Sequence, residues 1–264
     1  MIKEKIADMT TRTFMLENMV YLTAGIVDQK SADYSLEAAA CKIFGTESLW
    51  QVCNHGIQTA GGIAYVKEYP YERMMRDARI NMIFEGTNEI LHLLIALTGM
   101  RHLGDIMRKK VEGMRNPVTA IPAALSLMAS TRKRKVAPPK VHEALRKEAN
   151  LVADSVSEFG AMSARVAKKY RKQFMDKEYL QQRVSDIVID IYGILASLSR
   201  TSLKISQKGL KESEREIELT RAVAAAASER IHRNFAKIEK NDDPLTTGVS
   251  DATVNSGGYN IGLY

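Results

Sequence analysis

Apolar residues recur at every third or fourth position through most of the chain, with charged residues between them. This spacing places the apolar side chains on one face of a helix. In the first part of the chain it predicts helices over residues 1–24, 35–60, 71–80 and 88–110. Gly25 is expected to end the first helix, and Ser35, Pro70 and Thr87 to begin the other three. No segment alternates over enough residues to form a strand, so the pattern predicts an all-α protein.

The second part has no proline between residues 140 and 241, and apolar stripes run over 180–203 and 217–238. These stripes predict about three antiparallel helices packed as a bundle. Residues 113–139, directly before this part, contain four of the six prolines and the TRKRK run, which indicates a linker. The Gly-, Asn-, Ser- and Thr-rich end predicts a loose tail. The expected divisions are a helical domain over 1–112, the linker over 113–139, a helical extension over 140–241 and the tail over 242–264.

Composition narrows the class of protein. The 264 residues are 45% hydrophobic and 26% charged, which fits one or two ordinary domains. Cys41 and Cys53 are the only cysteines, too few for a disulfide-rich extracellular domain, so we expect both to be buried free thiols. The chain contains no run of about eighteen apolar residues, so no membrane span is predicted. The five histidines lack the spacing of a metal site. The opening residues resemble neither a signal nor a transit peptide and start within a helix, as expected of a fragment.

The positive charge is concentrated in one segment. Residues 101–140 contain ten Lys and Arg against Asp105 and Glu112, a net +8, whereas the rest of the chain sums to −1. Within residues 107–140 an apolar stretch lies between cations, which suits an anionic membrane surface. A solvated linker explains the same composition, and both alternatives stay open. Nucleic-acid binding is not expected, because aromatic residues do not interleave with the charges.

The candidate chemistry lies between residues 56 and 90. The Gly61-Gly62 pair is either a helix C-cap or a turn that lets a phosphate or ribose approach the backbone. Glu85 precedes a predicted helix start, where Ile83 and Phe84 could desolvate it and raise its pKa toward that of a general base. An exposed loop glutamate is the alternative. A further cluster on the 71–80 helix is expected to form salt bridges, and it consists of Arg73, Arg76, Asp77 and Arg79.

Three elements within residues 56–99 carry a family resemblance: the Gln-x-x-Gly-Gly turn, the helix YPYERMMRDARI and the motif IFEGTNEI, in that order. This part resembles the C-terminal helical domain of the acyl-CoA dehydrogenase flavoenzymes. The extension, with DIYGILASLSRTSLKI, resembles their very-long-chain branch, which includes a sister protein that serves as a respiratory complex I assembly factor. The resemblance implies an acyl-CoA dehydrogenase C-terminal helical bundle followed by a second helical domain, a vestigial bundle.

The resemblance also implies roles for individual residues. Glu85 corresponds to the base that removes the α-proton of an acyl-CoA thioester, and Phe84 and Gly86 would border the substrate. The FAD cofactor, bound across the interface of a homodimer, would contact two sets of residues: Thr87, Asn88 and Glu89, and Gln58, Thr59, Ala60, Gly61 and Gly62. Electron-transfer flavoprotein would be a partner, and the matrix side of the mitochondrial inner membrane the location.

The chain also departs from the family pattern. It lacks the family's N-terminal helical and middle β domains, so alone it is not expected to assemble a complete flavin site. His92 stands where relatives in this branch tend to carry arginine. Two functions therefore remain open: part of a long-chain acyl-CoA dehydrogenase, which the retained Glu85 favours, and a non-enzymatic scaffold that binds complex I assembly proteins, which the missing domains favour.

Overall fold

The computed structural model describes residues 1–30, 33–113, 121–122 and 131–259, and it gives no side-chain positions for 102–113. Every regular element in these ranges is a helix, which confirms the predicted all-α class. The elements of the first part are α1 (Ile2–Gln29), α2 (Ser35–Ala60), the 3-10 turn η1 (Gly61–Tyr65), α3 (Tyr71–Ile80) and α4 (Asn88–Gly113). Those of the second are η2 (Glu143–Leu145), α6 (Arg146–Tyr170), η3 (Arg171–Asp176), α7 (Glu178–Lys208), η4 (Lys211–Ser213), α8 (Glu214–Glu239) and α9 (Asp243–Asn255).

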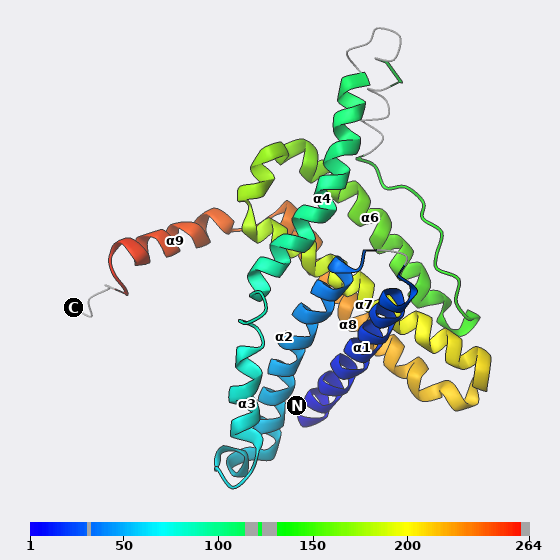
Figure 1. The fold of residues 1–264 in the computed structure, drawn as a ribbon, viewed down its shortest axis with the longest axis vertical. Coiled ribbons are helices and arrows are strands. Elements are labelled where there is room, and N and C mark those ends of the chain that lie inside the picture. Colours follow the sequence, from blue (N-terminus) through cyan, green and yellow to red (C-terminus); the bar gives the residue numbers. More distant parts are fainter. Residues whose placement is uncertain (31–32, 114–120, 123–130, 260–264) are drawn as a thin grey trace.

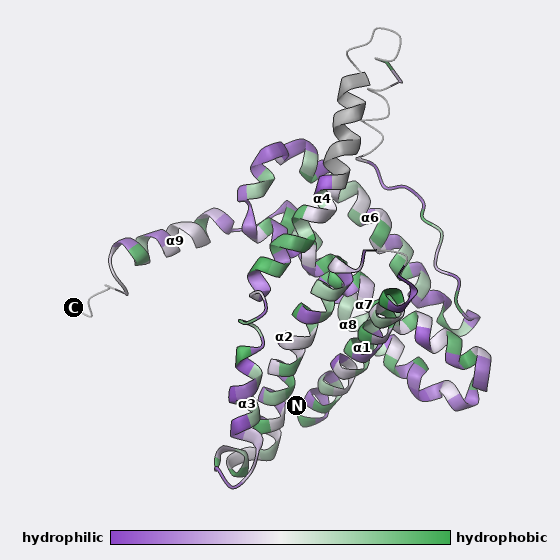
Figure 2. Cartoon of the chain, viewed as in Figure 1, coloured by the Kyte–Doolittle hydropathy of each residue, from purple (hydrophilic) through white to green (hydrophobic). Residues whose placement is uncertain are grey.

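Helix α7 is the centre of the arrangement (Figure 1), packed against α8, α1, α4 and α6. Its apolar stripe accounts for this position, since most of its buried residues are aliphatic. The part of α4 next to α7 is mostly apolar as well (Figure 2), because it contains the run ILHLLIAL. The first and second parts of the chain therefore share one continuous core.

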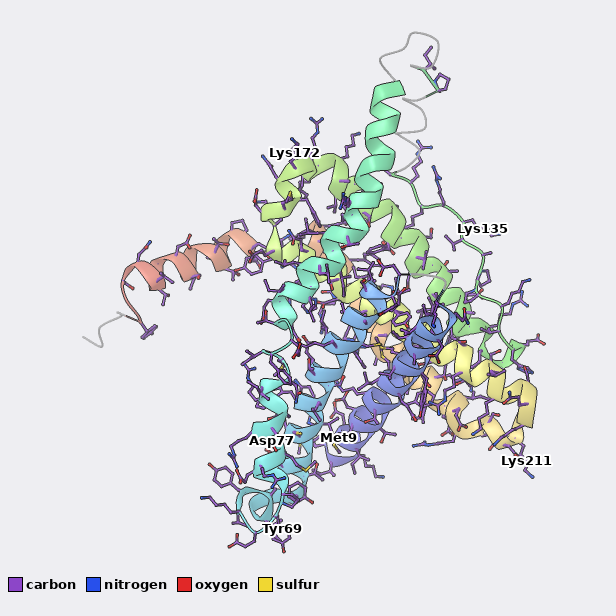
Figure 3. The ribbon with its side chains drawn as sticks, in the orientation of Figure 1. Met9, Tyr69, Asp77, Lys135, Lys172 and Lys211 are labelled. Carbon is purple, nitrogen blue, oxygen red and sulfur yellow. The ribbon has the colours of Figure 1, made fainter. Side chains whose placement is uncertain are left out.

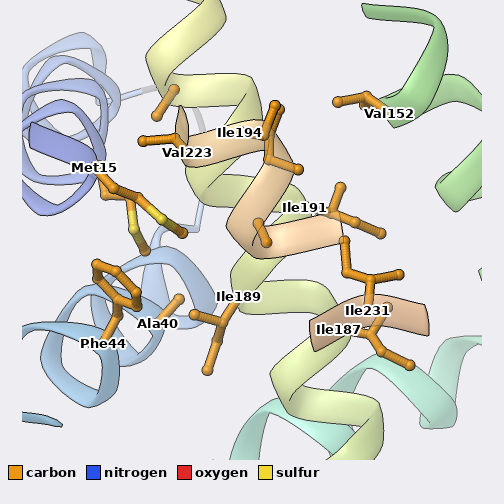
Figure 4. Close-up of a cluster of buried hydrophobic side chains, with 14 of the residues drawn as sticks. Met15, Ala40, Phe44, Val152, Ile187, Ile189, Ile191, Ile194, Val223 and Ile231 are labelled. Atoms are coloured by element: carbon orange, nitrogen blue, oxygen red, sulfur yellow. The ribbon is translucent and has the colours of Figure 1, made fainter. Parts of the chain in front are cut away.

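The contact between α1 and α7 is very close. Met15 points from α1 toward α7 beside Phe44 of α2 (Figure 4), and it is 2% exposed. A Cβ atom at Gly193 of α7 would lie 1.8 Å from Cε and 2.9 Å from Cγ of Met15. Any larger residue at Gly193 would therefore force the two helices apart or displace Met15 from its packed position.

Several predicted helix boundaries were wrong by a few residues. The first helix does not end at Gly25 but continues to Gln29, because Ile26 and Val27 extend the helical pattern and a single glycine is tolerated. Lys30, with φ 51°, ends it. Ser35 is the first helical residue rather than the cap, since its backbone N–H donates to the Asp33 carboxylate (2.9 Å). Similarly, Pro70 precedes α3 instead of beginning it.

The prediction of a loose tail was wrong for residues 243–255, which form α9. Pro244 in its first turn and side-chain bonds from Thr246 and Thr253 to backbone carbonyls support this helix locally. The helix has no buried residue and extends away from the other helices (Figure 1). Its first residue, Asp243, is held by Arg183 of α7 (Nη1 to Oδ2 2.8 Å).

The predictions for the linker and for the cysteines are confirmed only in part. Residues 131–142 contain no helix, as expected for a linker, but 114–120 and 123–130 lie outside the described residues. The proposed membrane-surface segment, 107–140, contains both of these ranges and stays a prediction, as do the domain divisions. Both cysteines are free thiols, but half-buried rather than buried. Across the described ranges, no helix is long and apolar enough to cross a membrane.

Candidate functional site

Glu85 occupies a tight turn between α3 and α4. Its φ is 55° and that of Gly86 is 92°, so two consecutive residues are left-handed, which is costly for a glutamate. Backbone bonds pin both sides of the turn: Phe84 N–H donates to Ile80 (3.2 Å) and Asn88 N–H to Met82 (3.1 Å). The predicted cap is confirmed, because the Thr87 hydroxyl accepts a bond from the backbone of Ile90 (3.4 Å).

The Glu85 side chain faces outward, and the expected desolvation is not present within this chain. Ile83 and Phe84 are 48% and 49% exposed, and Glu85 itself is exposed. Gly86 and Glu89 are also exposed, whereas Thr87 is half-buried and Asn88 is buried. The structure thus presents the acid, the glycine and the adjacent apolar side chains on one open surface, ready to be covered by a ligand or another domain.

A polar network joins this turn to α2. Lys42 Nζ donates to the Gly86 carbonyl (2.7 Å) and to Asn88 Oδ1 (2.8 Å). Asn88 Nδ2 in turn donates to Thr46 Oγ1 (3.0 Å), one turn further along α2, and to Glu47 (3.4 Å). Sequence analysis missed Lys42 and Thr46. Their i,i+4 spacing on α2 gave no indication of the partners, which lie more than forty positions away.

The Gly-Gly turn lies at the other end of α3. Gly61 ends α2 with φ 71°, as the C-cap prediction required. Gln58, Thr59, Gly61 and Gly62 are exposed, Ala60 is half-buried, and no atom lies within 4 Å of a Cβ built on either glycine. The ten residues of α3, about 15 Å, separate this turn from Glu85. Figure 3 shows Tyr69 at the tip of this part of the fold and Asp77 along α3.

The predicted salt-bridge cluster on α3 is confirmed in part: Arg73, Asp77 and Arg76 form ion pairs, Arg76 with Glu72, and none of the described ion pairs includes Arg79. Arg73 pairs with Asp77 (3.7 Å) and Arg76 with Glu72 (3.0 Å), each at i,i+4 spacing. Three of these four side chains are about seven-tenths exposed, so water screens both pairs and they add little to helix stability.

His92 of α4 contacts both α7 and α2, so its role is to hold these helices together. Its Nδ1 lies 3.0 Å from the Ser185 hydroxyl and 3.6 Å from Asp186 of α7, and its Nε2 lies 3.7 Å from Glu47 of α2. Asp186 and Glu47 also border a cavity of about 330 Å³ between α1, α2, α7 and α8. This cavity combines acidic side chains with the guanidinium groups of Arg12, Arg230 and Arg233, and Trp50 lines it as well. In the described ranges no His, Cys, Asp and Glu side chains group as a metal site.

Asp186 makes the stability of this region depend on pH. Burial raises its pKa from the ordinary 3.8 to about 6; His92 opposes this shift, while Glu47 and Asp190 add to it. The folded chain therefore holds the Asp186 proton more tightly than the unfolded chain does, so this group lowers stability as pH rises from 3.8 to about 6.

We expect Asp186→Asn to raise the free energy of unfolding near neutral pH by about 1 kcal/mol. This is less than the pKa shift implies, since the side chain is 34% exposed and screened by water. The gain should disappear below about pH 3, where the wild-type carboxyl is protonated in both states. Urea unfolding of both proteins across this pH range measures it. A less stable asparagine variant at neutral pH would contradict the prediction and indicate a net favourable pair with His92.

Two family models match the chain. Residues 1–100 match "Acyl-CoA dehydrogenase, C-terminal domain", and residues 143–259 match "ACAD9/ACADV, C-terminal domain". The first match contains both the Gly-Gly turn and the Glu85 turn. The second contains α7 and α8, which pack against the first part.

Similar proteins agree with these matches. The chain is 30% identical over 269 residues to the very long-chain specific acyl-CoA dehydrogenase of Rattus norvegicus, covering 97% of this chain and 41% of that protein. The human protein of the same description is 31% identical over 91% of this chain and 38% of its own length. A crystal structure of an acyl-CoA dehydrogenase complexed with FAD from Bacillus anthracis is similar with TM-score 0.71 and 27% identity, over 94% of this chain and 44% of that one.

The chain thus spans about two-fifths of the length of these curated relatives. Over residues 1–100 and 143–259, which make up most of its length, it belongs to the acyl-CoA dehydrogenase family.

Proposed function

We propose that this chain is the C-terminal part of an FAD-dependent dehydrogenase that introduces an α,β double bond into long-chain and very-long-chain acyl-CoA, with Glu85 as the catalytic base. The observation that carries the proposal is the Glu85 turn. An exposed carboxylate stands on a left-handed, hydrogen-bonded turn, beside a glycine and two exposed apolar side chains. Relatives named as very long-chain specific acyl-CoA dehydrogenases support the choice of substrate.

The residues present fit a flavin dinucleotide. Neither Gly61 nor Gly62 has an atom near the position of a Cβ, so a ribose or phosphate can approach the backbone there. Gln58, Thr59 and Ala60 would border the same end of the cofactor, and Thr87, Asn88 and Glu89 a second portion. Because α3 separates the two sets, they suit two cofactor molecules of a homodimer. When bound, FAD supplies a hydride acceptor for the substrate β-carbon.

The chain's own residues would carry out the proton transfer. The Glu85 carboxylate removes the α-proton, and closure of the site around Ile83 and Phe84 supplies the desolvation that the exposed turn lacks. Among the described residues, none accepts a hydrogen bond from the Glu85 backbone N–H. That donor is free to stabilise the developing negative charge on the thioester oxygen, while Gly86 leaves room for the acyl group.

The wider setting is part of the same proposal. Mitochondrial relatives support a mitochondrial location, at the matrix side of the inner membrane, with residues 107–140 as the peripheral contact. Electron-transfer flavoprotein would reoxidise the cofactor. The match to the ACAD9/ACADV domain keeps a second function, a scaffold for complex I assembly proteins. Affinity capture from mitochondria separates the two, since the scaffold requires recovery of respiratory assembly proteins.

The direct test is anaerobic titration of the full-length protein that contains this chain with octanoyl-CoA, palmitoyl-CoA or stearoyl-CoA. The proposal expects bound FAD whose oxidised absorbance is lost on adding the two longer substrates. A full-length protein that binds no FAD, or whose FAD none of the three reduces, would overturn it. Reduction by octanoyl-CoA alone would overturn the chain-length assignment only.

A further inference from the structure

We propose that Lys42 is a positioning residue that holds the Glu85-Gly86 turn in its catalytic conformation from α2. The inference rests on the proposed role of Glu85 and adds to it a residue that does not touch the substrate. Its basis is a bridge between two segments more than forty positions apart in the sequence, one of them the turn that carries the base.

The Lys42 ammonium has two well-defined acceptors. It donates 2.7 Å to the Gly86 carbonyl and 2.8 Å to Asn88 Oδ1, the distances expected of charge-assisted hydrogen bonds. The side chain is half-buried, and that burial lowers the pKa of its ammonium, while Glu89 and Glu47 act to raise it. A cation in this position binds the carbonyl oxygen more strongly than solvent would.

Asn88 makes the bridge rigid. It is 5% exposed, and its Nδ2 donates to Thr46 Oγ1 (3.0 Å), on the same face of α2, and to the Glu47 carboxylate (3.4 Å). The asparagine therefore has a fixed orientation, and its Oδ1 fixes the ammonium in turn. Because Asn88 Oδ1 holds the ammonium in place, the Lys42 side chain that binds the Gly86 carbonyl does not rotate freely.

This support bears on Glu85 because its backbone is strained. A left-handed glutamate costs about 1 kcal/mol or more, so the turn would relax toward other conformations without external bonds. The carbonyl that Lys42 holds belongs to Gly86, the residue after Glu85, so the bond fixes the peptide group between Gly86 and Thr87. Relaxation would move the carboxylate and the backbone N–H together, and a displacement of about 1 Å can cost a hundredfold in rate.

The test uses the full-length holoenzyme with Lys42→Met, Lys42→Arg and the control Lys211→Met, an exposed lysine at the far side of the fold (Figure 3). Three quantities are measured: kcat and KM for palmitoyl-CoA, FAD content, and uptake of solvent deuterium at the substrate α-carbon. We expect Lys42→Met to lower kcat and deuterium uptake together by about 10- to 100-fold, with KM and FAD content within twofold. Lys42→Arg should recover part of the loss, and Lys211→Met should change nothing.

Two results would overturn the proposal: unchanged kcat and deuterium uptake in Lys42→Met, or a loss of FAD content and melting temperature that accounts for the lost activity. If Lys42→Met does not fold, Thr46→Val is measured instead; it removes the hydroxyl that accepts from Asn88 and donates to the Ile43 carbonyl of its own helix. It must lower kcat at least about threefold with KM unchanged, or the proposal fails. Glu85→Gln in the same assays distinguishes failure of the positioning role from failure of the proposed function. If Glu85→Gln is inactive while Lys42→Met is normal, only the positioning role is wrong.

Discussion

Replacement of Glu85 by Gln is expected to lower kcat of the full-length enzyme at least about 1,000-fold. Glutamine has nearly the shape of glutamate and can occupy the same left-handed turn, but its amide cannot take up the substrate α-proton. The binding surface formed by Phe84 and Gly86 is unchanged by this substitution, so acyl-CoA should still bind. The loss should therefore appear in kcat and in the rate of flavin reduction within a single turnover.

The matched control is Glu229→Gln, an exposed glutamate on α8 that should leave kcat unchanged. Isothermal titration of the Glu85→Gln variant with palmitoyl-CoA checks that binding survives. If Glu85→Gln reduced flavin at the wild-type rate, Glu85 would not be the base, and another group would have to remove the α-proton.

The largest expected effect on stability comes from Arg230→Met, which should lower the free energy of unfolding by about 3–5 kcal/mol. Arg230 of α8 binds Asp190 of α7 with both Nε (3.1 Å to each oxygen) and Nη2 (2.6 Å to Oδ1). The Asp190 side chain is only 5% exposed, and burial raises its pKa against the influence of Arg230. Methionine preserves most of the packing but leaves a buried carboxylate without its partner.

Urea unfolding followed by circular dichroism measures this loss, with Arg215→Met as the control. Arg215 and Glu218 form a pair at 3.2 Å in which both side chains are about two-thirds exposed, so its loss should cost less than about 1 kcal/mol. A second variant, Arg230→Met with Asp190→Leu, should recover much of the stability, because no buried charge remains. Equal effects of Arg230→Met and Arg215→Met would contradict the prediction.

The helices were predictable because each carries its own apolar period and its own end residues. The stripe over 180–203 lies within α7, and Thr87 caps α4 as expected. Gly25 misled the prediction, because a glycine inside a helix costs only about 1 kcal/mol and neighbouring apolar residues outweigh it. Helix α9 was missed because its support is local and its residues are those of a typical loop.

The candidate site was predictable only in part. The motif around Glu85 identified the turn, but not the bonds that hold it, since Lys42 and Thr46 approach it through tertiary packing. The same applies to His92, whose partner Ser185 lies 93 positions away. The exposure of Glu85 agrees with the alternative of an exposed loop glutamate, because desolvation depends on what covers the turn and not on its sequence neighbours.

The shared core has a consequence for synthesis of the protein. Asn18 of α1 binds Ser197 of α7 (3.3 Å), a partner 179 positions later in the chain, and Met15 packs beside Gly193. At about 5–20 residues per second, a ribosome needs roughly 10–40 s to reach that partner after making α1. During this interval the inner face of α1 has no α7 to cover it. The Glu85 turn and its support from Lys42 lie within the first 88 residues and can form before α7 is made, whereas α1 stays uncovered until translation delivers α7.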